Sequence, residues 1–159
     1  PKAVLVPGIF NRWGPDFAVE HGLVLACNDG AVMTVGFGHH YPSVEVWSTS
    51  RVDQPWRVDD EGIDAVSDLL HAAHVAVSDD VPANEEWHYR PMGTGVPVPW
   101  RIILKLRTST LAGFEGGTKI YVNTISPTTL AAMLLPKLFE ARAAGRIAAM
   151  NLGDECGGR

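Results

Sequence analysis

The chain has 159 residues, of which 46% are hydrophobic and 19% charged, so it can form one domain with its own core but not two ordinary domains. No apolar run approaches the roughly 18 residues that a membrane span needs, and residues 1–8 are too short and too rich in proline for a secretory signal. We therefore expect a soluble protein with no membrane partner.

The formal net charge of -5 is unevenly distributed along the chain. Residues 1–89 hold four Lys and Arg against fourteen Asp and Glu, whereas residues 90–159 hold nine against four. The basic half can meet a phosphate-bearing ligand or the acidic half of a second copy. The alternative is that the two halves pack together and neutralise each other.

The two cysteines show no spacing typical of a disulfide framework or a metal site. Cys27 lies in an apolar run, and Cys156 lies in a glycine-rich stretch. We expect both to be free thiols, and the protein to be cytoplasmic.

Strands dominate the first third of the chain. Residues 2–6 form a short apolar strand candidate, and the apolar runs 22–27 and 31–37 are joined by Asn28-Asp29-Gly30, a typical hairpin turn. Residues 43–51 alternate and predict a third strand. The pattern indicates an antiparallel meander.

A helix follows the meander. Asp59 is placed as its N-cap, and apolar residues recur at helical spacing to about residue 74. Residues 78–99 contain four prolines and predict a long loop between the acidic and basic halves.

The second half predicts a hairpin and a helix. Residues 101–107 alternate between basic and apolar side chains, residues 118–125 form another β-rich run, and the glycines between them favour a hairpin loop. Ser126-Pro127 then has the form of an N-cap followed by proline in the first helical turn. Residues 151–159 predict a mobile tail.

The predicted fold class is α+β: a single domain over residues 1–159 with a mainly antiparallel sheet, a meander plus a hairpin, and two packed helices. We divide it into an acidic half (1–77), a loop (78–99), a basic half (100–150) and the tail (151–159). The sequence does not decide whether residues 146–150 are helix or strand.

A basic face on the predicted hairpin is the first candidate site. Cations of one strand would lie beside a lysine and an aromatic ring of its partner, an arrangement that suits phosphate or single-stranded nucleic acid. The alternative is a solvated sheet surface. The predicted ligand-binding residues here are Arg101, Lys105, Arg107, Lys119 and Tyr121.

Histidines supply the candidate catalytic residues, because imidazole titrates near neutral pH. His39 and His40 follow Gly38 in the connection between two strands, and they are ordinary loop histidines if the turn does not bring them together. His88 lies beside Arg90, and with the basic strand these residues could form a cationic pocket in which His88 donates a proton.

The sequence lacks a phosphate-binding glycine loop, a nucleophile elbow, a dinucleotide fingerprint and a paired-cysteine metal motif, so we expect no cofactor and no metal. Two functions remain. The first is a binding or assembly module that meets an anionic ligand, nucleic acid or a second copy through the basic hairpin face. The second is a small cofactor-free enzyme, a lyase, transferase or hydrolase, that uses histidine acid-base chemistry on a phosphate-bearing substrate.

Overall fold

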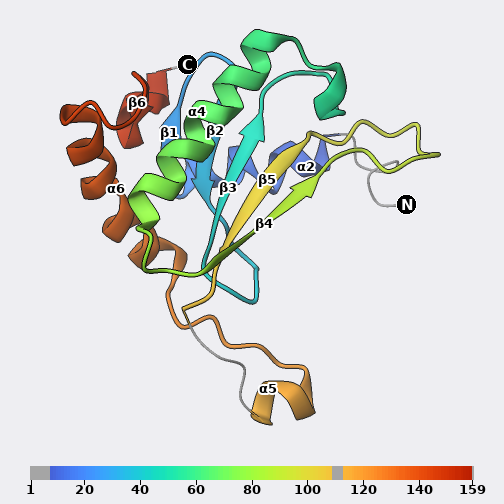
Figure 1. The fold of residues 1–159 in the computed structure, drawn as a ribbon. Coiled ribbons are helices and arrows are strands. Elements are labelled where there is room, and N and C mark those ends of the chain that lie inside the picture. Colours follow the sequence, from blue (N-terminus) through green and yellow to red (C-terminus); the bar gives the residue numbers. More distant parts are fainter. Residues whose placement is uncertain (1–7, 109–112, 159) are drawn as a thin grey trace.

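The computed structural model describes residues 8–108 and 113–158, so the strand predicted at residues 2–6 lies outside the described part of the chain. One antiparallel sheet in the order β4-β5-β3-β2-β1-β6 forms the centre of the molecule (Figure 1). The predicted α+β class is confirmed. Among the described residues, no helix is both long and apolar enough to cross a bilayer.

The strands of the sheet are β1 (Val24–Cys27), β2 (Ala31–Val35), β3 (Ser43–Ser48), β4 (Ala83–His88), β5 (Arg101–Leu106) and β6 (Asn151–Leu152). The α-helices are α2 (Ile9–Arg12), α3 (Pro15–Glu20), α4 (Asp60–Val77), α5 (Gly113–Thr118) and α6 (Pro127–Ala143). Two 3-10 helices, η1 (Pro55–Arg57) and η2 (Gly153–Gly158), complete the described elements.

The predicted hairpin between β1 and β2 is confirmed, and the side chain of Asn28 holds its turn. The Asn28 Oδ1 accepts hydrogen bonds from the backbone nitrogens of Gly30 at 3.1 Å and Ala31 at 2.8 Å. Its Nδ2 donates to the carbonyl of Ala65 in α4 at 2.8 Å. The turn is therefore fixed to the helix that covers the sheet.

The two long helices begin where the sequence predicts. Asp59 accepts a hydrogen bond from the backbone nitrogen of Gly62 at 3.0 Å, and Ser126 accepts one from that of Thr129 at 3.1 Å. Each bond satisfies an amide that the first helical turn would otherwise leave without a partner. Helices α4 and α6 pack against each other and against strands β1, β2 and β3, where they enclose the core.

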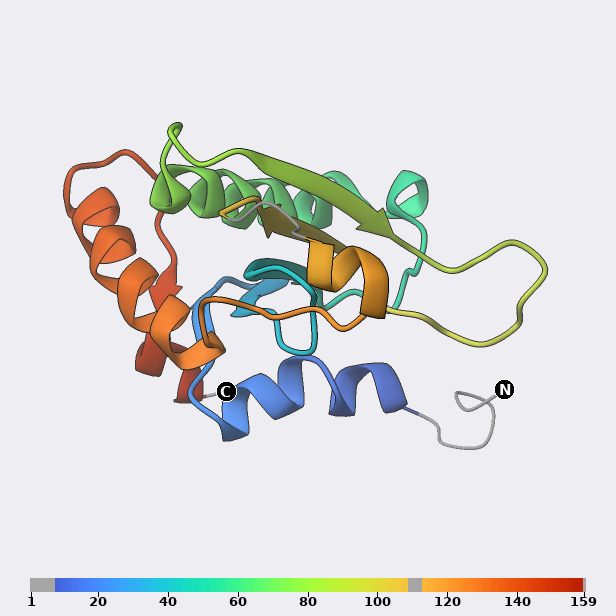
Figure 2. The ribbon, with the colours of Figure 1, turned by 90° about the horizontal axis from the view of Figure 1, so that it is seen from below.

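Helices α2 and α3 lie on the opposite side of the sheet from α4 (Figure 2). Helix α3 contacts β1 and β2. Gly14, just before α3, lies so close to the ring of Trp47 in β3 that a Cβ at this position would be 2.6 Å from two ring carbons. Glycine is therefore required here for the close approach of the segment that carries α2 and α3 to the sheet.

The basic hairpin predicted from residues 101–107 and 118–125 is wrong. Strand β5 pairs with β3 on one side and β4 on the other, while the glycine-rich segment starts a short helix, α5, and residues 119–125 have no strand partner. The pairing of strands depends on burial across the whole sheet. Strand β3 is buried along its full length, and β5 packs beside it rather than beside residues 118–125.

The loop predicted at residues 78–99 contains strand β4, so that part of the prediction is also wrong. Most side chains of β4 are exposed or half-buried, and prolines stand on both sides of it at Pro82 and Pro91. An edge strand keeps a polar surface and lacks the apolar alternation by which buried strands are found.

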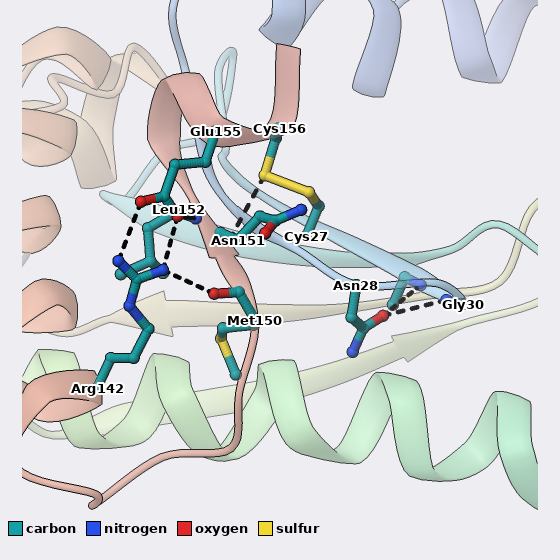
Figure 3. Close-up of a disulfide and its surroundings, with 10 residues drawn as sticks. Cys27, Asn28, Gly30, Arg142, Met150, Asn151, Leu152, Glu155 and Cys156 are labelled. Carbon is teal, nitrogen blue, oxygen red and sulfur yellow. Dashed lines mark hydrogen bonds and ion pairs between the residues drawn. A yellow bond between two sulfur atoms is a disulfide. The ribbon is translucent and has the colours of Figure 1, made fainter. Parts of the chain in front are cut away.

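Residues 151–158 have fixed partners where the sequence predicts a mobile tail. They form β6, which pairs with β1, and η2, and Cys156 forms a disulfide with Cys27 (Figure 3). The prediction of two free thiols is therefore wrong. The cytoplasmic location inferred from free thiols stays a prediction without that support. Residues 146–150 are neither helix nor strand but an irregular connection.

Candidate functional site

The register of the sheet gathers polar side chains on the face opposite α4. Trp47 lies directly opposite Arg101, and Glu45 lies opposite Ile103, which in turn faces Glu86 of β4. Because paired residues project to the same side, alternate residues of three strands share this surface. We call it the polar face; its members are Ser43, Glu45, Trp47, Asn84, Glu86, His88, Arg101, Ile103 and Lys105.

The carboxylate of Glu45 lies at the centre of a hydrogen-bonded cluster on this face. Only 4% of Glu45 is exposed. Its Oε1 lies 2.6 Å from the Nε2 of His39, and its Oε2 accepts a hydrogen bond from the indole Nε1 of Trp47 at 2.9 Å. Both oxygens are thus partnered, as a buried carboxylate requires.

The backbone before His39 brings its ring onto Glu45. Gly38 has a φ of +71°, a conformation that glycine adopts without strain. A Cβ at Gly36 would lie 2.8 Å from the Cδ2 of His39, so glycine at that position leaves room for the imidazole. Since Nε2 is engaged by Glu45, Nδ1 is the ring nitrogen that is left to exchange a proton with another molecule.

Two cations of β5 lie beside this cluster, each next to a partner. The guanidinium of Arg101 lies 4.3 Å from the centre of the Trp47 ring, a cation-π contact. The Nζ of Lys105 lies 2.6 Å from the Oε1 of Glu86. The hydrogen bond from Lys105 lowers the pKa of Glu86, against a smaller opposing effect of burial.

His88 lies at the edge of the polar face. Its Nε2 is 3.3 Å from the Oε2 of Glu86, and nearly half of its side chain is exposed. Arg90, which the sequence places with His88, instead pairs through Nε with Asp53 at 2.8 Å and donates to the carbonyl of Thr94 at 2.8 Å. Arg90 therefore holds the loop after β4.

The remaining candidates lie around the loop that carries His39. The imidazole of His40 stacks on the ring of Tyr121, so this tyrosine is close to the histidine pair and not on a strand beside β5. Arg107 and Lys119 are exposed. The structure thus places His39, Arg101, Lys105 and His88 on or beside one face.

Sequence reasoning missed Glu45 and Glu86 as members of the site. The available signal was an acidic residue at position 45 within a strand whose neighbours are valine and tryptophan. A carboxylate in such a position needs partners in the folded state, and those partners are His39 and Trp47.

A cavity of about 740 Å³ adjoins the polar face at Trp47. It lies between the segment that carries α2 and α3, the end of β3, and residues 95–99, and its lining includes Ser48, Thr49 and Ser50. Trp47 is therefore part of both the Glu45 cluster and the cavity wall. The volume is in the range of small-molecule sites.

No group of three or more His, Cys, Asp or Glu side chains that could hold a metal ion occurs within residues 8–108 and 113–158. The polar face itself offers a histidine fixed by a carboxylate, and two cations. These groups can bind an anion and move a proton.

Comparison with known families identifies the class of protein to which this antiparallel sheet and its polar face belong. The chain belongs to the family described as a domain of unknown function, DUF4921, whose model matches residues 3–159. No curated protein matches the chain.

Solved structures share the fold. A uridylyltransferase structure has 17% sequence identity and a TM-score of 0.64, covering 78% of this chain and 44% of that one. An ADP-glucose phosphorylase from Arabidopsis thaliana with bound ADP-glucose has 21% identity and a TM-score of 0.67, covering 80% and 45%. A GalT-like protein from the same plant has 19% identity and a TM-score of 0.64, covering 76% and 43%. The chain thus spans less than half the length of these proteins.

Proposed function

We propose that this domain binds a phosphate-bearing substrate on the polar face and takes part in its chemical conversion. In this proposal His39 moves a proton, Glu45 orients and stabilises the imidazole, and Arg101 and Lys105 bind the anionic group. The geometry of His39 on the buried carboxylate of Glu45 is the observation that carries it.

A histidine with one ring nitrogen on a buried carboxylate is suited to acid-base chemistry. The carboxylate fixes the tautomer and the ring orientation, and it stabilises the imidazolium that forms when the other nitrogen takes a proton. Glu45 is itself held by the indole of Trp47, so the pair does not depend on solvent for its geometry. One fifth of the His39 side chain is exposed, which leaves access for a substrate.

The two cations of β5 supply the electrostatic part of the proposal. Arg101 lies against Trp47, and Trp47 donates a hydrogen bond to Glu45, so Arg101 is linked to the His39–Glu45 pair through the indole. Lys105 is held by Glu86 on the neighbouring strand, and an anion that displaces Glu86 would bind the ammonium group of Lys105 in its place.

The comparisons support the same class of substrate. The names of two proteins with this fold, a uridylyltransferase and an ADP-glucose phosphorylase, describe enzymes that act on compounds containing phosphate. At about one-fifth identity this likeness is one of fold, so the residues of this chain must carry the argument for activity.

The binding-module interpretation has less support than the enzyme interpretation. It required a continuous basic hairpin face, and that hairpin is not formed. Tyr121, which was expected on that face, lies against His40 instead. Recognition of nucleic acid and association with a second copy stay predictions.

The test uses ADP-glucose as the probe. Binding is measured by calorimetry and by the fluorescence of the tryptophans, and turnover is measured by mass spectrometry after incubation with inorganic phosphate. We expect His39→Asn to retain binding and to lower turnover by about 100-fold or more, as for loss of a general acid or base. Lys105→Met should weaken binding about tenfold or more.

His71→Asn is the matched control, because His71 is exposed on α4, away from the polar face. It should change neither binding nor turnover. Absence of binding by ADP-glucose, pyrophosphate and inorganic phosphate alike would overturn the proposal. Wild-type turnover in His39→Asn would remove His39 from the mechanism.

A further inference from the structure

The disulfide between Cys27 and Cys156 lies outside the polar face and joins positions separated by 129 residues in sequence. Cys27 ends strand β1 and is 6% exposed, whereas Cys156 lies in η2 and is only partly buried (Figure 3). Both cysteines line a cavity of about 480 Å³ between β1, α3 and η2. A small molecule in this cavity can therefore reach the bond, and the less buried of its two sulfurs is that of Cys156.

A second attachment holds the same segment independently of the disulfide. Arg142 of α6 makes two contacts with the carboxylate of Glu155, at 2.6 Å and 3.0 Å. The Oε2 of Glu155 also accepts a hydrogen bond from the backbone nitrogen of Leu152 at 2.9 Å, and Arg142 donates to the carbonyl of Met150 at 2.9 Å. Breaking the disulfide would therefore leave Cys156 close to Cys27.

We infer that Cys27–Cys156 is a reversible thiol-disulfide exchange site, at which a low-molecular-weight thiol attacks the Sγ of Cys156. The difference in burial selects this sulfur, because exchange depends on access as well as on thiolate character. The inference does not depend on the function proposed for the polar face.

The exchange is balanced in two steps. The thiolate of the attacking molecule forms a bond to the Cys156 Sγ, the Sγ–Sγ bond breaks, and Cys27 leaves as a thiolate that takes a proton from water. A second thiol then attacks the sulfur of the bound molecule, which leaves as a disulfide with that thiol, and Cys156 is released as a thiol. The protein disulfide gains two electrons, and the two thiol molecules lose them.

The Arg142–Glu155 pair makes the reaction reversible. After reduction, β6 and η2 stay beside β1. Each thiol is therefore held at a high effective concentration near the other, and the disulfide can re-form. In the disulfide form the Sγ of Cys156 lies 3.5 Å from the carbonyl oxygen of Asn151, so a reduced Cys156 that kept this position would have an acceptor for its S–H.

Reduced and oxidised glutathione are the probes for the first test. Wild-type protein is equilibrated with the pair, quenched by alkylation and mapped by mass spectrometry. We expect an intramolecular disulfide under oxidising conditions and, at intermediate ratios, glutathione on Cys156 in at least tenfold excess over Cys27. Free thiols under oxidising conditions, or glutathione chiefly on Cys27, would overturn the inference.

Single-cysteine variants give a second measurement. Cys27→Ser leaves Cys156 alone, and Cys156→Ser leaves Cys27 alone; both are first checked for the wild-type circular dichroism spectrum. Cys156 should react with oxidised glutathione at least ten times faster than Cys27.

Hydrogen exchange gives a third measurement. In wild-type protein the hydrogen exchange of residues 151–156 should rise on reduction, and it should rise further in reduced Glu155→Gln, which also lacks the ion pair. Equal reaction rates of the two cysteines would contradict the thiol-disulfide exchange site. Hydrogen exchange that reduction leaves unchanged in both the wild-type protein and Glu155→Gln would contradict it as well.

Discussion

The imidazole of His40 lies flat on the ring of Tyr121, with the ring centres 3.8 Å apart and the ring planes 8° apart. Tyr121 belongs to a segment, residues 119–125, that has no strand partner, and His40 belongs to the connection between β2 and β3. The stack therefore attaches an irregular segment to the loop that also carries His39.

Removal of the Tyr121 ring should loosen this segment. Tyr121→Ala is expected to lower the free energy of unfolding by about 0.5–1.5 kcal/mol, the usual contribution of an aromatic pair. It should also speed hydrogen exchange at residues 119–125. Tyr121→Phe keeps the ring and should behave like the wild type in urea denaturation. Equal stability of the alanine and phenylalanine variants would show that the stack contributes nothing.

The approach of Gly14 to Trp47 predicts a steric effect on stability. A Cβ at position 14 would be 2.6 Å from the indole ring and 2.8 Å from the carbonyl of Phe10. Gly14→Ala should therefore cost about 1–3 kcal/mol of unfolding free energy, as overpacking does, and should change the tryptophan emission. Gly116→Ala, where a Cβ meets nothing within 4 Å, is the control. A loss of stability no larger than that of the control would contradict this packing.

Lys105 should govern the titration of Glu86. The hydrogen bond from Lys105 is the largest cause of the lowered pKa of Glu86, so Lys105→Met should move that pKa back toward its ordinary value. The folded-state pKa is depressed, so the pair stabilises the protein above the ordinary pKa of a glutamate and loses this effect as the pH falls through the folded-state value. Glu86 is 42% exposed, so we expect at most about 1 kcal/mol. Carboxyl NMR titration of both proteins measures the shift, and an unchanged Glu86 pKa in Lys105→Met would refute the assignment.

The lowered pKa of Glu155 should make the stability of the protein depend on pH in the acid range. Its pKa is lowered from 4.5 to about 2, chiefly by the hydrogen bond from Arg142 and then by that from the backbone of Leu152. The unfolded chain binds a proton at a higher pH than the folded chain does, so this stabilisation is complete above about pH 5 and is lost as the pH falls toward 2.

Glu155→Gln should therefore flatten the dependence of unfolding free energy on pH between about 5 and 2, because glutamine does not titrate. Thermal melts across this range compare the variant with wild-type protein. Glu140→Gln, an exposed carboxyl on α6 whose contact with Arg146 is 3.6 Å long, should keep the wild-type slope. A wild-type slope in Glu155→Gln would mean that other carboxylates cause the transition.

Features set by neighbouring residues could be predicted from the sequence. The Asn28 turn needs only a short polar segment between two apolar runs, and the caps at Asp59 and Ser126 satisfy amides three residues away. The β1–β2 hairpin and the starts of α4 and α6 therefore follow from local physical chemistry.

Features that depend on distant partners could not be predicted in the same way. The sequence predicts the nearest β-rich run as the partner of residues 101–107, but in the whole sheet β3 and β4 lie beside them. Nothing in the sequence near Cys27 or Cys156 indicates that β6 brings them together. The roles of His39, His88 and the cations remain predictions, although the sequence singled out His39 without the glutamate that fixes it.

The two margins of the sheet bear on aggregation. One margin is β4, which carries the carboxylates Glu85 and Glu86, and the other is β6, which is only two residues long. Charged side chains and a very short terminal strand both discourage an incoming chain from extending the backbone ladder. The folded domain is therefore protected against strand-to-strand polymerisation, and a crowded solution of it should resist conversion into fibrils for as long as β4 and β6 keep their places.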